Sequence, residues 1–138
     1  MGIALTQRMK NWIEGMGVHV ALANAAAFPT VIVTDSCKVD GEIIRIPLSS
    51  AQKVQAEACL SENGYAAIAP GKLGGVRAPY QFKGAAVLEA DEIVVTVDKI
   101  YCTKPGYEAG IRIDIGGFDQ MKDFDESRWK DLMPPCQK

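Results

Sequence analysis

A short stretch with the sequence PLSSAQKV, residues 47–54, brings together side chains that can hold an anion. Ser49 and Ser50 supply hydroxyls, and Gln52 supplies an amide. Lys53 adds an ammonium group. Ser49 followed three positions later by Gln52 is a capping box, which marks the start of a helix. The first N–H groups of a helix have no intrahelical partner and bind anions well. The stretch therefore predicts an anion site; ordinary helix capping beside a solvated lysine is the alternative.

The place of Lys53 in the first turn of that helix needs an explanation. The N-terminus of a helix carries partial positive charge, so a cation there is unfavourable by roughly 0.3–1 kcal/mol. Either the lysine is solvated, or a nearby anion reverses the sign of the interaction. Three polar residues, Thr34, Asp35 and Ser36, follow an apolar run upstream and add further groups to the candidate site.

The spacing of apolar residues predicts two helices in the first half of the chain. Over residues 5–16, apolar residues recur every three or four positions and therefore share one helix face. They are Leu5, Met9, Trp12 and Met16. The second helix runs from Ser49 or Ser50 to about residue 62, and we expect its buried side to hold Ala51, Val54, Ala58 and Leu60–Ser61. A last short helix is predicted over residues 126–132.

Runs rich in small and β-branched residues predict strands joined by short turns. Asp40-Gly41 indicates a hairpin, and Gly84 inside a strand indicates a bulge or a close backbone approach. The predicted strands are 18–25, 29–38, 42–48, 65–70, 80–89, 93–102 and 111–115, with a glycine-rich loop over 71–79. Regularly spaced strands with few helices favour a mainly β fold, an antiparallel barrel with a few short flanking helices.

Composition narrows the classes of protein to consider. The 138 residues correspond to one domain, and a formal net charge of −2 gives no reason to expect a nucleic-acid partner. The most apolar stretch, 18–33, is interrupted by polar residues and is shorter than the ~20 residues that a membrane span needs. The first residues lack the pattern of a secretion signal. We expect a soluble, cytoplasmic protein that does not enter membranes.

Metal and thiol chemistry have little support in the sequence. No two cysteines form a C-x-x-C pair, so we expect free thiols rather than a zinc or dithiol site. The four are Cys37, Cys59, Cys102 and Cys136. The single histidine, His19, lies in an apolar run, where a packed and hydrogen-bonded side chain is the expected role. We predict no metal site, and no residue stands out as a dedicated acid or base.

The order of these motifs resembles the FMN-binding split β-barrel family, which includes pyridoxamine 5'-phosphate oxidase-like proteins. Lys53-Val54 followed by Glu57 matches the segment that follows the third strand in that family. The stretch YQFKGA, residues 80–85, matches a later strand. The resemblance covers roughly residues 5–105. Two features depart from it: the turn between the first two strands keeps only Pro29, and Val54 stands where a threonine often helps to hold the phosphate.

The resemblance implies that FMN binds and that the chain forms a homodimer with each flavin at the subunit interface. The FMN phosphate would then contact Lys53 and its neighbours Ser49, Ser50 and Gln52. Strand backbone would meet the edge of the isoalloxazine ring, with Gln81 as a candidate side-chain partner. The backbone segments are Val33–Ser36 and Ile46–Leu48, which include Thr34, Asp35, Ser36, Pro47 and Leu48.

The activity implied is that of an FMN-dependent oxidoreductase. Such an enzyme would accept hydride from a reduced nicotinamide or pass electrons to a small acceptor, because the flavin supplies the redox chemistry. Two alternatives remain open at this point. One is a non-enzymatic flavin electron carrier or store, and the other is a module that binds haem or another tetrapyrrole. A branch of the family that uses the deazaflavin F420 is a further variant.

Overall fold

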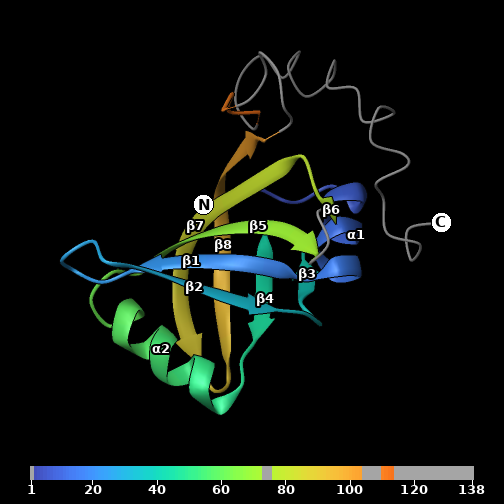
Figure 1. The fold of residues 1–138 in the computed structure, drawn as a ribbon. Coiled ribbons are helices and arrows are strands. Elements are labelled where there is room, and N and C mark those ends of the chain that lie inside the picture. Colours follow the sequence, from blue (N-terminus) through green and yellow to red (C-terminus); the bar gives the residue numbers. More distant parts are fainter. Residues whose placement is uncertain (1, 73–75, 104–109, 114–138) are drawn as a thin grey trace.

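The computed structural model describes residues 2–72, 76–103 and 110–113, and the fold is mainly antiparallel β (Figure 1). Two helices accompany the strands in this part of the chain. In chain order the elements are α1 Gln7–Met16, β1 Val18–Ala23, β2 Pro29–Thr34, β3 Lys38–Asp40, β4 Ile43–Pro47, α2 Ser50–Leu60, β5 Tyr65–Lys72, β6 Val76–Arg77, β7 Tyr80–Glu89 and β8 Glu92–Cys102.

The strands form one curled sheet with the order β2-β1-β5-β7-β8-β4-β3, and β6 pairs with the end of β5. All of these pairings are antiparallel. Where the curl brings β2 near β4, the Thr34 hydroxyl donates a hydrogen bond of 2.9 Å to the Pro47 carbonyl. The sheet is therefore a barrel that stays split between β2 and β4; we call this gap the seam.

The helix α1 packs its apolar face into the core of the barrel, where Met9, Trp12 and Ile13 are fully buried. It begins after Thr6, whose side-chain oxygen accepts a hydrogen bond from the Met9 N–H. It ends at Gly17, which has a positive φ of 84°. A side chain at position 17 would approach the Thr34 carbonyl oxygen to 2.6 Å, so glycine is required both by the turn and by the contact.

The second helix, α2, lies where the sequence predicts it but buries a different side. Ala56 and Cys59 are buried. Of the residues expected on the buried side, Leu60 packs half-buried against the core, whereas Ala51, Val54, Ala58 and Ser61 are exposed. Few strongly apolar residues occur in SAQKVQAEACL, so the apolar pattern does not determine the orientation of this helix. Its first turn is instead attached to neighbouring elements by polar side chains, described below.

The predicted strand 29–38 is divided in two by the structure. β2 ends at Thr34 and β3 begins at Lys38, and between them Ser36 adopts a positive φ of 60°. This conformation is uncommon outside glycine, and a residue that adopts it turns the chain out of the sheet. The prediction of one continuous strand was therefore wrong, and the break creates one wall of the candidate site.

The bulge predicted at Gly84 is confirmed. The β7–β8 register shifts between Lys83 and Gly84, and a Cβ atom at position 84 would lie 1.9 Å from the Thr96 carbonyl oxygen. The extra residue on β8 places both Asp98 and Lys99 on the outer face, the side of the sheet that faces away from the core. The bulge thus changes the face to which the side chains of β8 after Val97 point.

Several predicted features lie wholly or partly outside the described residues. The helix over 126–132 and Cys136 fall outside them, and of the predicted strand 111–115 the structure describes only an isolated bridge between Arg112 and Tyr101. The loop predicted over 71–79 contains the short strand β6. Among the described residues, neither helix is long and apolar enough to cross a membrane. Cys37, Cys59 and Cys102 are buried free thiols.

Candidate functional site

An open pocket of about 780 Å³ lies at the seam, where β2 and β4 end and α2 begins. Its volume falls within the range of roughly 300–1,000 Å³ that is usual for small-molecule sites. Seven of the ten predicted cofactor-binding residues line this seam pocket. They are Thr34, Asp35, Ser36, Pro47, Leu48, Ser49 and Gln52; Met16, Val33 and Gly71 complete the lining.

The first turn of α2 is held against β2 by the side chain of Gln52. The Ser49 N–H donates to Oε1 of Gln52 at 3.0 Å, and the Ser49 hydroxyl accepts from the Gln52 N–H at 3.2 Å, which completes the predicted capping box. Nε2 of Gln52 also donates a hydrogen bond of 2.9 Å to the Val33 carbonyl across the seam. The capping residues thus fix the distance between the two walls of the pocket.

Lys53 has an anion beside it, and that anion belongs to the chain itself. Its Nζ lies 3.1 Å from Oδ1 of Asp91, in the turn between β7 and β8. The Leu48 N–H also bonds to the Asp91 carbonyl at 2.9 Å, so this turn lies close to the start of α2. The negative charge of Asp91 offsets the unfavourable interaction between the lysine and the positive end of the helix dipole. Lys53 is not among the described residues that line the seam pocket.

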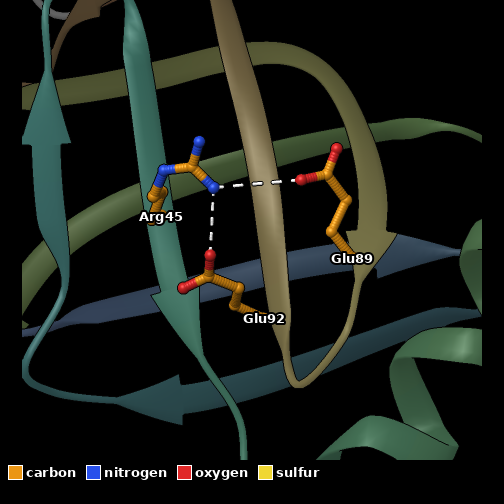
Figure 2. Close-up of polar contacts among 3 residues, drawn as sticks. All are labelled: Arg45, Glu89 and Glu92. Atoms are coloured by element: carbon orange, nitrogen blue, oxygen red, sulfur yellow. Dashed lines mark hydrogen bonds and ion pairs between the residues drawn. The ribbon is translucent and has the colours of Figure 1, made fainter.

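The same turn neutralises a second cation. Figure 2 shows Arg45 of β4 reaching Glu92 at 3.0 Å and Glu89 at 3.9 Å. Together with Asp91, these carboxylates form an acidic turn that attaches β4 and α2 to the β7–β8 hairpin. Three acidic residues within four positions, EADE, are visible in the sequence, but their role was not predicted from it.

The seam pocket is acidic. Asp35 lines it, and none of its lining residues that the structure describes is a lysine, arginine or histidine. A smaller polar pocket of about 440 Å³ lies alongside and shares Met16, Asp35 and Ser36. Burial, reinforced by the charges of Asp35 and Glu14, raises the pKa of Cys37 to about 12, so this thiol stays protonated. No group of three or more potential metal ligands gathers in the described residues.

The other two predicted residues, Ser50 and Gln81, are not among the described lining residues of the seam pocket. Ser50 is the exposed first residue of α2. Gln81 is half-buried on the outer face of β7 and pairs in register with Tyr101 of β8. Its neighbours in β7, Tyr80 and Phe82, point to the core instead. Gln81 therefore lies on the outer face of a strand that contributes no described residue to the lining of the seam pocket.

His19 differs from its expected role. It lies half-buried on the outer face of β1, in register with Val33 of β2 and Ala69 of β5. Within the part of the chain that the structure describes, its imidazole makes no side-chain hydrogen bond or ion pair. We expected a packed and hydrogen-bonded histidine. His19 is partly packed, but its side chain makes no hydrogen bond within the described residues.

Comparison with known proteins supports the fold. No family model matches the chain, and no curated protein matches it. Among solved structures, HupZ of Group A Streptococcus, crystallised with V5 and hexahistidine tags, superposes with a TM-score of 0.60 at 20% identity. The match covers 77% of this chain and 99% of HupZ. A variant of HupZ with one histidine changed to alanine gives a TM-score of 0.56 at 19% identity, covering 70% of this chain and 97% of the variant. The likeness shows a split-barrel fold.

Proposed function

We propose that this chain is an FMN-binding split-barrel flavoprotein that takes part in oxidation–reduction. The observation that supports the proposal is the seam pocket. The family resemblance implies flavin contacts in two separate segments, 34–36 and 47–53, and at Gln81, and seven of these ten residues line one pocket of suitable size. When bound, the flavin supplies the redox chemistry, while the protein supplies orientation and electrostatics.

The residues present fit the phosphate end of FMN provided that Lys53 changes partner. The Lys53–Asp91 pair is exposed, with 39% and 82% of the two side chains accessible, and such pairs stabilise a protein by about 0–1 kcal/mol. A phosphate dianion, which forms stronger charge-assisted hydrogen bonds, competes well against one exposed carboxylate. Lys53, with the hydroxyl of Ser50 beside it, would then hold the phosphate at the start of α2.

The remaining pocket residues would position the ring. Asp35 and Ser36, where the chain leaves the sheet, and Pro47 and Leu48 line the pocket from its two walls. The Asp35 carboxylate disfavours a negative charge nearby, so we place the phosphate at the α2 end and the ring towards Met16.

The first experiment is an absorbance spectrum of the purified protein, followed by titration with FMN and with riboflavin. Oxidised flavin absorbs in the visible range whether it is free or bound, so the spectrum shows whether flavin accompanies the purified protein. Quenching of flavin fluorescence during the titration reports binding. Lys53→Ala should weaken FMN binding at least about tenfold, because a charge-assisted contact contributes about 1.5–3 kcal/mol, and should leave riboflavin binding unchanged. Lys10→Ala in α1 is the matched control. No flavin binding by the wild type would refute the proposal.

Bleaching of the bound flavin by NAD(P)H would distinguish an enzyme from an electron carrier or store.

A second candidate, a haem-binding split-barrel module, is favoured by one observation. His19, the one histidine of the sequence, has no side-chain partner among the described residues and lies beside the exposed Val33 and the half-buried Ala69. A free imidazole next to apolar surface is a suitable axial ligand for haem iron. Haem titration should then give a Soret band that His19→Ala shifts or removes. A Soret band that is unchanged in that variant would exclude His19 as the ligand.

We also propose that the chain forms a homodimer. On the outer face of β2, Val31 and Val33 are 60% and 49% exposed, and Ala21 of β1 lies in register with Val31. Exposed apolar residues that adjoin one another on a sheet suit a protein interface. Light scattering on the wild type and on Val31→Lys tests this, with a monomeric mass expected for the variant alone.

A further inference from the structure

A cluster of cations lies on the outer face of β7 and β8, towards the ends of these strands that are far from the turn connecting them. That turn lies beside α2 (Figure 1). Lys83 of β7 and Lys99 of β8 are register partners, and Arg112 forms an isolated bridge with Tyr101 on the other side of β8. We call Lys83, Lys99 and Arg112 the basic face. Gln81, the register partner of Tyr101, lies beside it.

The register alone makes this arrangement unfavourable in isolation. Directly opposed side chains on antiparallel strands have Cβ atoms about 4.5–5.5 Å apart, and like charges so placed destabilise the sheet. Within the described residues, neither Lys83 nor Lys99 forms an ion pair of the kind that Arg45 and Lys53 form. The nearby Asp98 carboxylate accepts a hydrogen bond of 2.6 Å from the Tyr65 hydroxyl. After the hydrogen bond between Lys99 and Tyr65, the charge of this carboxylate is one of the causes that raise the pKa of Lys99.

Aromatic rings hold both ammonium groups in place. Nζ of Lys83 lies 4.8 Å from the centre of the Tyr101 ring, and Nζ of Lys99 lies 5.4 Å from that of Tyr65. Nζ of Lys99 also donates a hydrogen bond of 3.3 Å to the Tyr65 hydroxyl. This hydrogen bond raises the pKa of Lys99, so the ammonium form persists. Two cations restrained in this way lose less freedom when a ligand binds.

Arg112 adds a third cation, and its Nη2 donates a hydrogen bond of 3.2 Å to the Asp98 carbonyl. Lys83 and Lys99 therefore bring two ammonium groups to one face of the sheet, and among the described residues the Asp98 carboxylate lies beside them. We propose that the basic face binds a compact oxyanion, a phosphate or a carboxylate group, between Lys83 and Lys99. This site is independent of the seam pocket and of any flavin.

The test is a titration of the ¹⁵N-labelled protein, followed by NMR without FMN, at an ionic strength kept constant with chloride. One arm uses inorganic phosphate and the other malonate, which separates the two sources of oxyanion. We expect saturable shifts at the amides of Lys83 and Lys99 with at least one anion. Lys83→Gln combined with Lys99→Gln should weaken that binding at least about tenfold, since charge-assisted hydrogen bonds are lost.

Two control variants make the result decisive. Lys83→Arg combined with Lys99→Arg keeps both charges and should retain binding within about threefold, whereas Lys10→Gln in α1 should not alter it. Shifts that grow linearly with both anions, or saturable shifts that persist in the double glutamine variant, would overturn the proposal. Because no flavin is present, neither result depends on whether FMN binds at the seam pocket.

Discussion

The seam pocket and the basic face differ in the partners that their polar side chains have within the chain. At the seam, the side chains of Gln52 and Thr34 bond to the backbone of the opposite wall, and the cation beside the pocket, Lys53, is paired with Asp91. On the basic face, Lys83 and Lys99 oppose each other across two strands. The difference teaches that a polar cluster is not by itself evidence of a ligand. What matters is which groups the fold leaves without a partner of opposite charge.

The largest expected effect concerns the buried thiol next to the seam. Burial, with the charges of Asp35 and Glu14, raises the pKa of Cys37 from 9.0 to about 12. As the pH rises between these values, the unfolded thiol loses its proton while the folded thiol keeps it. The free energy of unfolding should therefore fall with rising pH, by up to about 4 kcal/mol across this window.

Urea unfolding at a series of pH values, compared between wild type and Cys37→Ala, measures this term. The variant loses contacts at every pH, but the gap between the two proteins should narrow as the pH rises from 9.0, the ordinary pKa of a cysteine thiol. The subtraction removes the titration of lysines and tyrosines that both proteins share. Parallel pH profiles would show that neither burial nor the charges of Asp35 and Glu14 raise the pKa of this thiol.

The next largest effect should appear at the bulge that builds the basic face. In Gly84→Ala the new Cβ would lie 1.9 Å from the Thr96 carbonyl oxygen, so the backbone has to move. We expect a loss of about 3 kcal/mol in the free energy of unfolding, at the upper end of the usual cost of overpacking. Ala85→Ser, on the exposed side of the same strand, is the control and should change stability little.

Gly84→Ala also sharpens the comparison between the two regions. It should displace Asp98 and Lys99 and so weaken the proposed oxyanion binding on the basic face. FMN binding at the seam pocket, to whose lining β7 and β8 contribute no described residue, should not change. Equal losses at both sites would mean that the variant disturbs the whole barrel. Unchanged stability would show that β8 accommodates the methyl group by a shift of its backbone.

Much of the fold was predictable from local signals. The capping box at Ser49, the Asp40-Gly41 turn and the glycine inside β7 each require a particular backbone geometry, and the structure has all three. The orientation of α2 was not predictable, because its sequence has little apolar bias and its position depends on Gln52 and Lys53 contacting distant segments.

The candidate site was predictable in part for the same reason. Residues 34–36 and 47–52 lie in two short segments, so local motifs identify most of the pocket lining. The break at Ser36 was missed, because nothing in TDSC signals a positive φ as clearly as glycine would. Asp91 was missed because its contact with Lys53 spans 38 positions. The basic face draws on residues from 83 to 112, and only the strand register brings them together.

A smaller effect is expected from the hydrogen bond that bridges the seam. Thr34→Val removes the hydroxyl that donates to the Pro47 carbonyl at 2.9 Å. The loss should be about 1 kcal/mol, the usual net contribution of one hydrogen bond. Thr96→Val is the matched control, because the Thr96 hydroxyl makes no hydrogen bond within the described residues. Urea unfolding of both variants measures the difference, and equal losses would show that the bond across the seam contributes nothing.

The smallest effect, and the one that bears most directly on the proposed function, is the exchange of partners at Lys53. Asp91→Asn and Lys53→Gln, singly and together, should give a coupling energy of about 0.2–1 kcal/mol, because the pair is exposed, and salt should reduce it. Under the proposed function Asp91 would compete with the FMN phosphate for the same ammonium group, so Asp91→Asn should strengthen FMN binding up to about fivefold and leave riboflavin binding unchanged. Glu92→Gln, which breaks the pair with Arg45 instead, should not have this effect on FMN binding.

If Asp91→Asn weakened FMN binding, the carboxylate would be a positioning group for Lys53 rather than a competitor of the phosphate. Asp91 would then orient Lys53 towards the phosphate and would not be displaced by it. The seam pocket and the basic face would in that case differ in what orients each lysine, a carboxylate at the seam and an aromatic ring on the basic face.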